Sequence, residues 1–136
     1  MFLLDTNVVS EPTKPKPRPS VMAWLQAQAA SDLFVSVITL GEITIGIESL
    51  EPGPKRDRLN AWQSTLASRG FAGRVLDVTH EIAVRWGQLE ARHGRTLARL
   101  DTLIAATALL HDLTVVTRNM RDFEHLPVRA INPWLT

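Results

Sequence analysis

The segment DTLIAATALLHDLTVVT, residues 101–117, decides the fold class of this chain, because it joins a helix directly to a strand. The spacing of its apolar residues predicts a helix over residues 101–110. Residues 113–117 then form a short run rich in β-branched side chains, which is typical of a strand. A strand that follows a helix in this way is half of the repeating unit of a parallel sheet.

The same alternation continues on both sides of this segment. Four more short runs predict strands, at residues 2–5, 33–37, 74–78 and 128–131. Helices are predicted between them, at about residues 21–30, from the cap Thr39 to about residue 50, at 55–69, and from the cap Thr79 to about Gly94. Residues 12–19 hold four prolines and are predicted to be a connector. We therefore predict an α/β fold with a central parallel sheet flanked by helices on both faces, formed by one domain over residues 1–136.

The composition fits a globular protein and excludes several other classes. Hydrophobic residues make up 45% of the 136 residues and charged residues 21%, which is unlike a disordered or fibrous chain. The absence of cysteine excludes a disulfide framework, a thiolate metal site and a cysteine nucleophile. The N-terminus meets Asp5 without a basic region, unlike a secretory signal, and the longest apolar stretch, residues 103–110, is too short for a bilayer. We expect a cytoplasmic protein without a membrane segment.

Acidic residues stand where ligands bind in open α/β sheets, beyond the carboxyl ends of the strands. Asp5 ends the first predicted strand, Glu42 lies in the helix after the second, and Asp122 follows the strand of residues 113–117. A fourth acid, Asp101, stands at the start of the helix that leads into that strand. Acids that converge at one edge repel one another unless a cation lies among them. Oxygen ligands without histidine or cysteine favour Mg²⁺ or Mn²⁺.

Each of these acids also has a purely structural explanation. Asp5 could form an Asx turn, and Glu42 could complete a capping box with Thr39. Asp101 could be a helix N-cap, and Asp122 could be an ordinary loop residue. These explanations do not account for the repeated placement at strand ends, which favours a metal site. From the pattern alone, both interpretations remain open.

Five stretches of the sequence together resemble the PIN-domain family. They are FLLDTNVVSEP at residues 2–12, SVITLGE at 36–42, LDTLIAATA at 100–108, VTRNMRDF at 116–123 and NPW at 132–134. They follow the order of the family along essentially the whole chain, and the likeness is strongest to the VapC-type toxins, in their FitB-like branch. Members often carry a proline just before the third stretch, where this chain has Leu97-Ala98-Arg99, so the loop that presents Asp101 is less constrained.

The resemblance implies a ribonuclease that acts as the toxin of a type II toxin–antitoxin pair and uses Mg²⁺ or Mn²⁺. By residue, it implies that Asp5, Glu42 and Asp101 hold the metal, with Asp122 as the fourth acid. It assigns a supporting role, in which hydroxyl and amide groups orient carboxylates or water, to Thr6, Asn7, Thr117 and Asn119. Asn119 is implied as a substitute ligand as well.

The resemblance also implies partners. A cognate antitoxin would enter the active-site groove, and operator DNA would be bound only through the antitoxin complex. The toxin itself would form a homodimer or a dimer of dimers, with RNA as its substrate.

Arginine residues are the candidates for binding that substrate, although the net charge of +1 does not by itself indicate a nucleic-acid partner. Arg118 and Arg121 lie within the fourth stretch, and we expect them to bind RNA near the scissile phosphate. Arg85, Arg92 and Arg99 recur every seven residues, and we interpret them as a solvated face rather than a phosphate-binding row.

Three functions are compatible with these patterns. The leading hypothesis is a metal-dependent endoribonuclease in which water attacks the phosphodiester without a covalent intermediate. The first rival is a non-catalytic or weakly catalytic protein whose main task is to form an operator-binding complex with the antitoxin. A phosphatase that forms an aspartyl phosphate is disfavoured, because a second aspartate two positions after Asp5 is missing.

Overall fold

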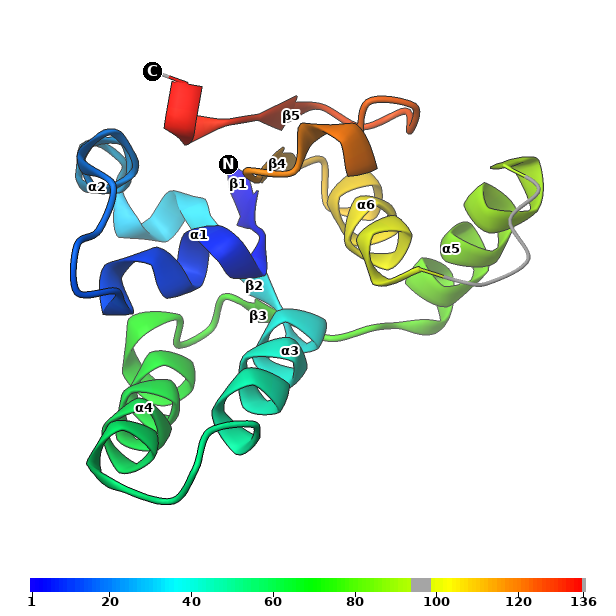
Figure 1. Ribbon diagram of the computed structural model, residues 1–136. Helices are drawn as coiled ribbons and strands as arrows, with labels where there is room; N and C mark the ends of the chain where they lie inside the picture. Colours follow the sequence, from blue (N-terminus) through cyan, green and yellow to red (C-terminus); the bar gives the residue numbers. More distant parts are fainter. Residues whose placement is uncertain (94–98, 136) are drawn as a thin grey trace.

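The computed structural model describes residues 1–93 and 99–135 of the chain. Its centre is a sheet in the order β3-β2-β1-β4-β5, in which all neighbouring strands are parallel (Figure 1). The strands are β1 (Phe2–Leu4), β2 (Leu33–Ser36), β3 (Val75–Leu76), β4 (Thr114–Val116) and β5 (Ala130–Ile131). Every strand lies within its predicted range, and the parallel sheet confirms the predicted fold class.

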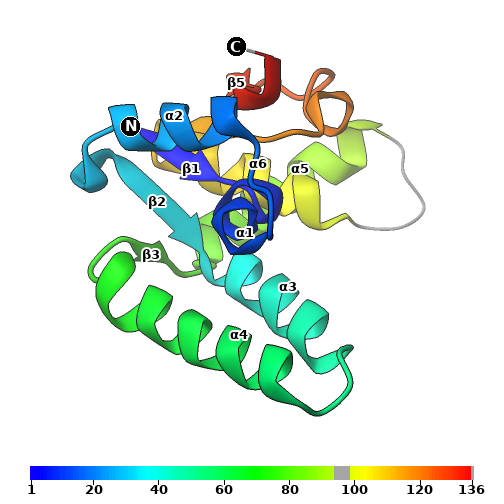
Figure 2. The same ribbon diagram turned by 60° about the vertical axis from the view of Figure 1, so that its left-hand side comes forward.

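Helices cover both faces of this sheet (Figure 1, Figure 2). They are α1 (Thr6–Ser10), α2 (Pro19–Ala27), α3 (Val37–Glu48), α4 (Pro54–Thr65), α5 (His80–His93) and α6 (Leu100–Leu110). The first four pack on one face, whereas α6 packs on the other face and α5 lies against α6. None of the helices in the described part of the chain has the length and apolar character needed to cross a membrane.

Alternate side chains of each strand enter opposite cores, which is why the strands appear in the sequence as continuous apolar runs. Leu4 of β1 packs in one cluster with Val8 of α1 and Ile43 of α3. Its neighbour Leu3 packs in the other cluster with Ile104 of α6. Burial on both faces fixes the position of β1 in the middle of the sheet.

The order of the strands creates a switch point between β1 and β4. The chain runs outward from β1 through β2 to β3, and then returns to the opposite side of β1 to form β4. Connections on the two sides therefore leave in opposite directions, and a crevice forms at the carboxyl ends of these two strands. The backbone N–H of Asp5 donates to the carbonyl of Val116 at 2.9 Å, which places the two strand ends side by side.

The beginning of α3 differs from the prediction. Ser36 caps this helix, since its hydroxyl accepts a hydrogen bond from the Ile38 N–H at 3.0 Å, and the helix begins at Val37. The predicted cap Thr39 is instead buried inside the first turn. Two hydroxyl residues three positions apart are both competent caps, and the burial of the following turn selects the earlier one.

Other boundaries shift in smaller ways. The third predicted helix ends as α-helix at Thr65 and continues as a π-helical turn, Leu66–Gly70. The predicted cap Thr79 is confirmed, because its hydroxyl accepts from the Ile82 N–H at 3.2 Å. The predicted end of that helix near Gly94 and the residues Leu97 and Ala98 lie outside the described residues.

Candidate active site

The structure brings the four predicted acids together around one pocket. The pocket has a volume of about 330 Å³, and its polar lining includes Asp5, Thr6, Asn7, Ser10, Glu42, Asp101, Asn119 and Asp122. It lies at the carboxyl ends of β1 and β4, where the switch point opens the crevice. Local structure alone does not explain this convergence, because the acids come from four separate segments of the chain.

Each acid reaches the pocket from a different element. Asp5 is the N-cap of α1, and its side chain accepts from the Thr6 N–H rather than closing the predicted Asx turn. Glu42 lies in the second turn of α3, not at the third position of a capping box, so that structural explanation was wrong. Asp101 is the second residue of α6 and not its N-cap, which is Arg99. Asp122 ends a short 3-10 turn, Met120–Asp122, after β4.

The carboxylate of Asp5 is held by three donors. The backbone N–H of Thr6 donates to Oδ1 at 2.8 Å, and the Thr117 hydroxyl donates to Oδ2 at 2.7 Å. The Asn7 amide makes a longer contact of 3.4 Å to the same Oδ2. Burial raises the pKa of Asp5 above its ordinary value, and the charges of nearby acids raise it further, against the lowering effect of the hydrogen bonds.

Glu42 is joined to this group through Thr6. The Thr6 hydroxyl donates to Oε1 of Glu42 at 2.8 Å, while the Thr6 N–H donates to Asp5. Burial is the largest cause that raises the pKa of Glu42, and the charges of Asp5 and Asp101 add to it. Thr6 therefore sets the relative position of two carboxylates whose ionised forms are both disfavoured.

Two further predicted supporting residues, Asn7 and Thr117, connect this network to the loop after β4. The Asn7 side-chain oxygen accepts from the Arg118 N–H at 3.1 Å. Thr117 is fully buried and its hydroxyl also accepts from the Asn119 N–H at 3.0 Å. The loop that carries Asn119 is thus fixed to the same side chains that orient Asp5.

Asp101 and Asp122 are joined by a residue that the sequence interpretation missed. The Nε of Arg99 donates to Oδ1 of Asp101 at 3.3 Å, and its Nη2 lies 3.5 Å from Oδ1 of Asp122. Arg99 was interpreted as part of a solvated face, and its side chain is indeed about half exposed, at 51%. Its position two residues before Asp101 was the one available signal.

The two arginines predicted to bind RNA lie outside the acidic pocket. Arg118 is exposed, and its guanidinium carbon lies 5.6 Å from the ring centre of Trp134, in a cation–π arrangement. Arg121 is exposed in the short turn that ends at Asp122. Both positions are near the pocket in the chain, and neither residue contributes to its described lining.

The donor atoms of the pocket fit a hard divalent cation in their chemistry. All are oxygens or amides, which suit Mg²⁺ or Mn²⁺, and burial together with the neighbouring acids raises the pKa of Asp5 and of Glu42. As they stand, however, no three acidic, histidine or cysteine side chains among residues 1–93 and 99–135 are close enough together to hold an ion. An ion held by three of these side chains would therefore require them to move closer together.

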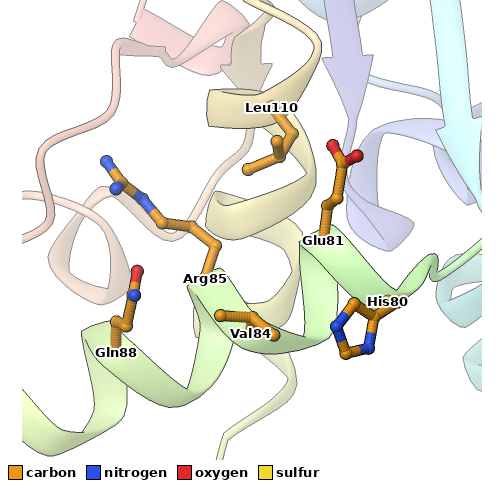
Figure 3. Close-up of a pocket in the computed structure, with 6 residues that line it drawn as sticks. All are labelled: His80, Glu81, Val84, Arg85, Gln88 and Leu110. Carbon is orange, nitrogen blue, oxygen red and sulfur yellow. The ribbon is translucent and has the colours of Figure 1, made fainter.

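A second pocket lies between α5 and α6 and has a different character (Figure 3). It has a volume of about 370 Å³ and is lined by His80, Glu81, Val84, Arg85, Gln88 and Leu110. Figure 3 shows His80 and Glu81 pointing away from each other, so they do not form an acid–base pair. This pocket contains none of the predicted site residues.

Comparisons with known proteins agree with the geometry. A family model described as PIN domain matches residues 2–128. Toxin FitB of Neisseria gonorrhoeae is 39% identical over 98% of this chain and 99% of that protein. VapC ribonuclease Y4jK of Sinorhizobium fredii is 35% identical over 98% of both chains. A solved structure of FitAB bound to an IR36 DNA fragment superimposes with a TM-score of 0.89 at 38% identity, covering 98% of this chain and 96% of that one.

Proposed function

The chain belongs to the PIN-domain family, and we propose that it is the endoribonuclease toxin of a type II toxin–antitoxin pair. The observation that carries the proposal is the pocket at the switch point, where four acids from separate segments meet. Relatives named as a toxin and as a ribonuclease align over 98% of the chain.

Asp5, Glu42, Asp101 and Asp122 would hold Mg²⁺ or Mn²⁺ in this proposal. When bound, a divalent ion supplies Lewis-acid stabilisation of phosphate charge and lowers the pKa of water. The chain supplies the positioning. Thr6 and Thr117 fix the carboxylates of Asp5 and Glu42 through hydrogen bonds of 2.7–2.8 Å, and Asn119 adds an amide at the edge of the pocket.

The RNA backbone would lie along the rim formed by Arg118 and Arg121. Arginine presents a planar fork of donors that matches a phosphate. The backbone of Arg118 is fixed on both sides, since its N–H donates to Asn7 and its carbonyl accepts from Asn132 at 3.4 Å. A phosphate bound to Arg118 would therefore be held in a fixed position relative to Asn7, which contacts Asp5.

A groove that continues from the acidic pocket supports the proposed antitoxin partner. It shares Thr6, Ser10 and Glu42 with the pocket. Its other walls are mostly apolar and come from Ile43, Ile47, Leu59 and Trp62 of α3 and α4. A protein segment with apolar side chains would fill this groove and cover the acids in the same step.

The assembly would follow the relatives in its further partners. One solved relative is a FitAB complex bound to DNA, so we extend operator binding through the antitoxin complex to this chain. A homodimer, or a dimer of dimers, and a cytoplasmic location are part of the same proposal.

The proposal is tested by incubating labelled total RNA with purified, antitoxin-free protein in Mn²⁺ or Mg²⁺, and in EDTA. We expect discrete fragments with either metal and none in EDTA. The variant Asp101→Asn should give none, whereas the control Asp112→Asn, which removes an exposed carboxylate near the amino end of β4, should cleave like the original protein. Metal-independent cleavage, or full activity of Asp101→Asn, would overturn the assignment. Folded protein that cleaves no RNA would favour the rival role in an operator-binding complex.

A further inference from the structure

A positively charged side chain lies against two of the acids that line the acidic pocket. Arg99 reaches Asp101 and Asp122 with two different nitrogen atoms, at 3.3 and 3.5 Å. We infer that Arg99 is a built-in counter-cation of the acid cluster, and that Mg²⁺ or Mn²⁺ must displace its guanidinium in order to bind Asp101 and Asp122. This inference rests on the proposed metal-dependent function and gives Arg99 control over metal affinity.

The backbone of Arg99 is anchored in a way that presents the side chain to the acids. Its N–H donates to Oε1 of Glu90 at 3.2 Å, and its carbonyl accepts from the Trp86 indole at 3.3 Å. Both partners belong to α5, so Arg99 joins α5 to the start of α6. With the backbone fixed, the guanidinium can leave the acids by rotation of the side chain alone.

The Arg99 side chain forms ion pairs instead of capping α6. Arg99 occupies the N-cap position of α6, where a short polar side chain would normally accept from the helix N–H groups, yet arginine has donors only. Its donors point instead to one carboxylate on α6 and one in the turn after β4, 23 positions further along the chain. The contact therefore links two parts of the pocket that sequence proximity does not connect.

The guanidinium of Arg99 can be displaced by a metal ion because its side chain is half exposed. The Arg99 side chain is 51% exposed, whereas the side chains of Asp101 and Asp122 are 14% and 35% exposed. Ion pairs with an exposed partner contribute little, so a divalent ion that gains several carboxylates can compete with them. The remaining acids, Asp5 and Glu42, are held by neutral donors and need no such displacement.

The test is calorimetric titration of Mn²⁺ into the full chain and its Arg99→Gln variant, without RNA. Removing a unit positive charge beside a divalent ion should lower the Kd for Mn²⁺ by about tenfold. A second neutral variant, Arg99→Met, should give the same result. Arg99→Lys keeps the charge but loses the fork, and its Kd should stay within about threefold of the original. The matched control is Arg129→Gln, which breaks an arginine–aspartate pair of 3.0 Å at the amino end of β4 and β5, and its Kd should not change.

The outcomes separate this inference from the proposed function. If the original chain binds Mn²⁺ and both neutral variants bind it equally or more weakly, the counter-cation role is wrong and the metal site stands. If neither the original chain nor the variants bind Mn²⁺, the metal-dependent function itself fails, and the inference with it. Circular dichroism of each variant confirms that the titrated protein is folded.

Discussion

The acids on the two sides of the acidic pocket have different kinds of partner, neutral donors on one side and a cation on the other. Asp5, which caps α1, and Glu42 of α3 are held by neutral hydroxyl and N–H donors, and burial raises the pKa of both. Asp101 and Asp122, on the opposite side, share a charged partner, Arg99. The difference indicates that the first side orients carboxylates for a ligand, whereas the second side compensates charge until the ligand arrives.

Removing one acid from each side of the pocket should have the largest effect. Asp5→Asn and Asp101→Asn should each lower RNA cleavage by more than about a hundredfold, because even residues behind the ligands of a metal site typically contribute 10- to 100-fold. Both variants should remain folded, since each loses one charge from a crowded cluster. Rates are measured at saturating Mn²⁺ together with thermal melts. A large loss from one variant only would mean that the two sides do not serve one reaction.

The neutral donors of the first side should matter next. Thr6→Val removes the hydroxyl that donates to Glu42 at 2.8 Å but keeps the shape of the side chain, and cleavage should fall by about 10- to 100-fold. The control is Thr44→Val, which removes an exposed hydroxyl further along α3. Thr6→Ser should restore most of the activity. Activity of Thr6→Val equal to that of the control would show that Thr6 does not orient Glu42.

The stability of the metal-free protein should depend on pH through the first side of the pocket. The folded pKa values of Asp5 and Glu42 are raised, so the native state binds more protons than the unfolded chain between the ordinary carboxyl range and the raised values. The free energy of unfolding therefore increases as pH falls through that window. The gain is fully present below the ordinary carboxyl pKa. Urea unfolding in EDTA at several pH values measures it, and the variant Asp5→Asn should show a weaker slope.

Glu11, outside the acidic pocket, should show the opposite dependence on pH. Burial opposes the charge of Glu11, but hydrogen bonds from Lys14 and Arg18 and the charges of Lys14 and Arg118 hold its pKa below the ordinary value. Glu11 should therefore lose its stabilising effect as pH falls, the opposite sign to Asp5. In the Glu11→Gln variant, the free energy of unfolding should therefore increase more as pH falls than it does in the original chain. Equal slopes for Asp5→Asn, Glu11→Gln and the original chain would contradict both assignments.

The smallest effect is expected from Arg118, which lies outside the acidic pocket. Arg118→Gln should weaken RNA binding by a few fold and reduce its salt dependence, since one phosphate contact contributes about one unit to that slope. Mn²⁺ affinity should stay unchanged, because Arg118 does not line the described acidic pocket. Fluorescence anisotropy of labelled RNA at several salt concentrations, in EDTA, measures it. A changed Mn²⁺ affinity would place Arg118 in the metal site instead.

Much of the fold was predictable because burial on both faces makes the strands of a parallel sheet apolar throughout. Asp5 could be placed at the end of β1, and Asp122 after β4, since carboxyl ends of parallel strands share one edge. The start of α3 was not predictable, because Ser36 and Thr39 are both suitable caps and only tertiary burial separates them.

The acidic residues that line the pocket could be predicted from the sequence. The contacts between their side chains could not. The acids were found from their positions relative to strands. The contact of Arg99 with Asp122 depends on where a turn after β4 lies relative to α6, which no local pattern encodes. The seven-residue spacing of Arg99 with Arg85 and Arg92 was interpreted as a solvated face, an interpretation that did not include this contact.

In the proposed mechanism, both sides of the pocket belong to one metal site. Crystals soaked in Mn²⁺ and measured near the manganese absorption edge test it directly, because the anomalous signal locates the ion. We expect a peak bound jointly by Asp5 and Asp101, with the Arg99 guanidinium turned away from Asp101 and Asp122. A peak at the pocket between α5 and α6, or an ion bound to one side while Arg99 keeps its contacts, would contradict it.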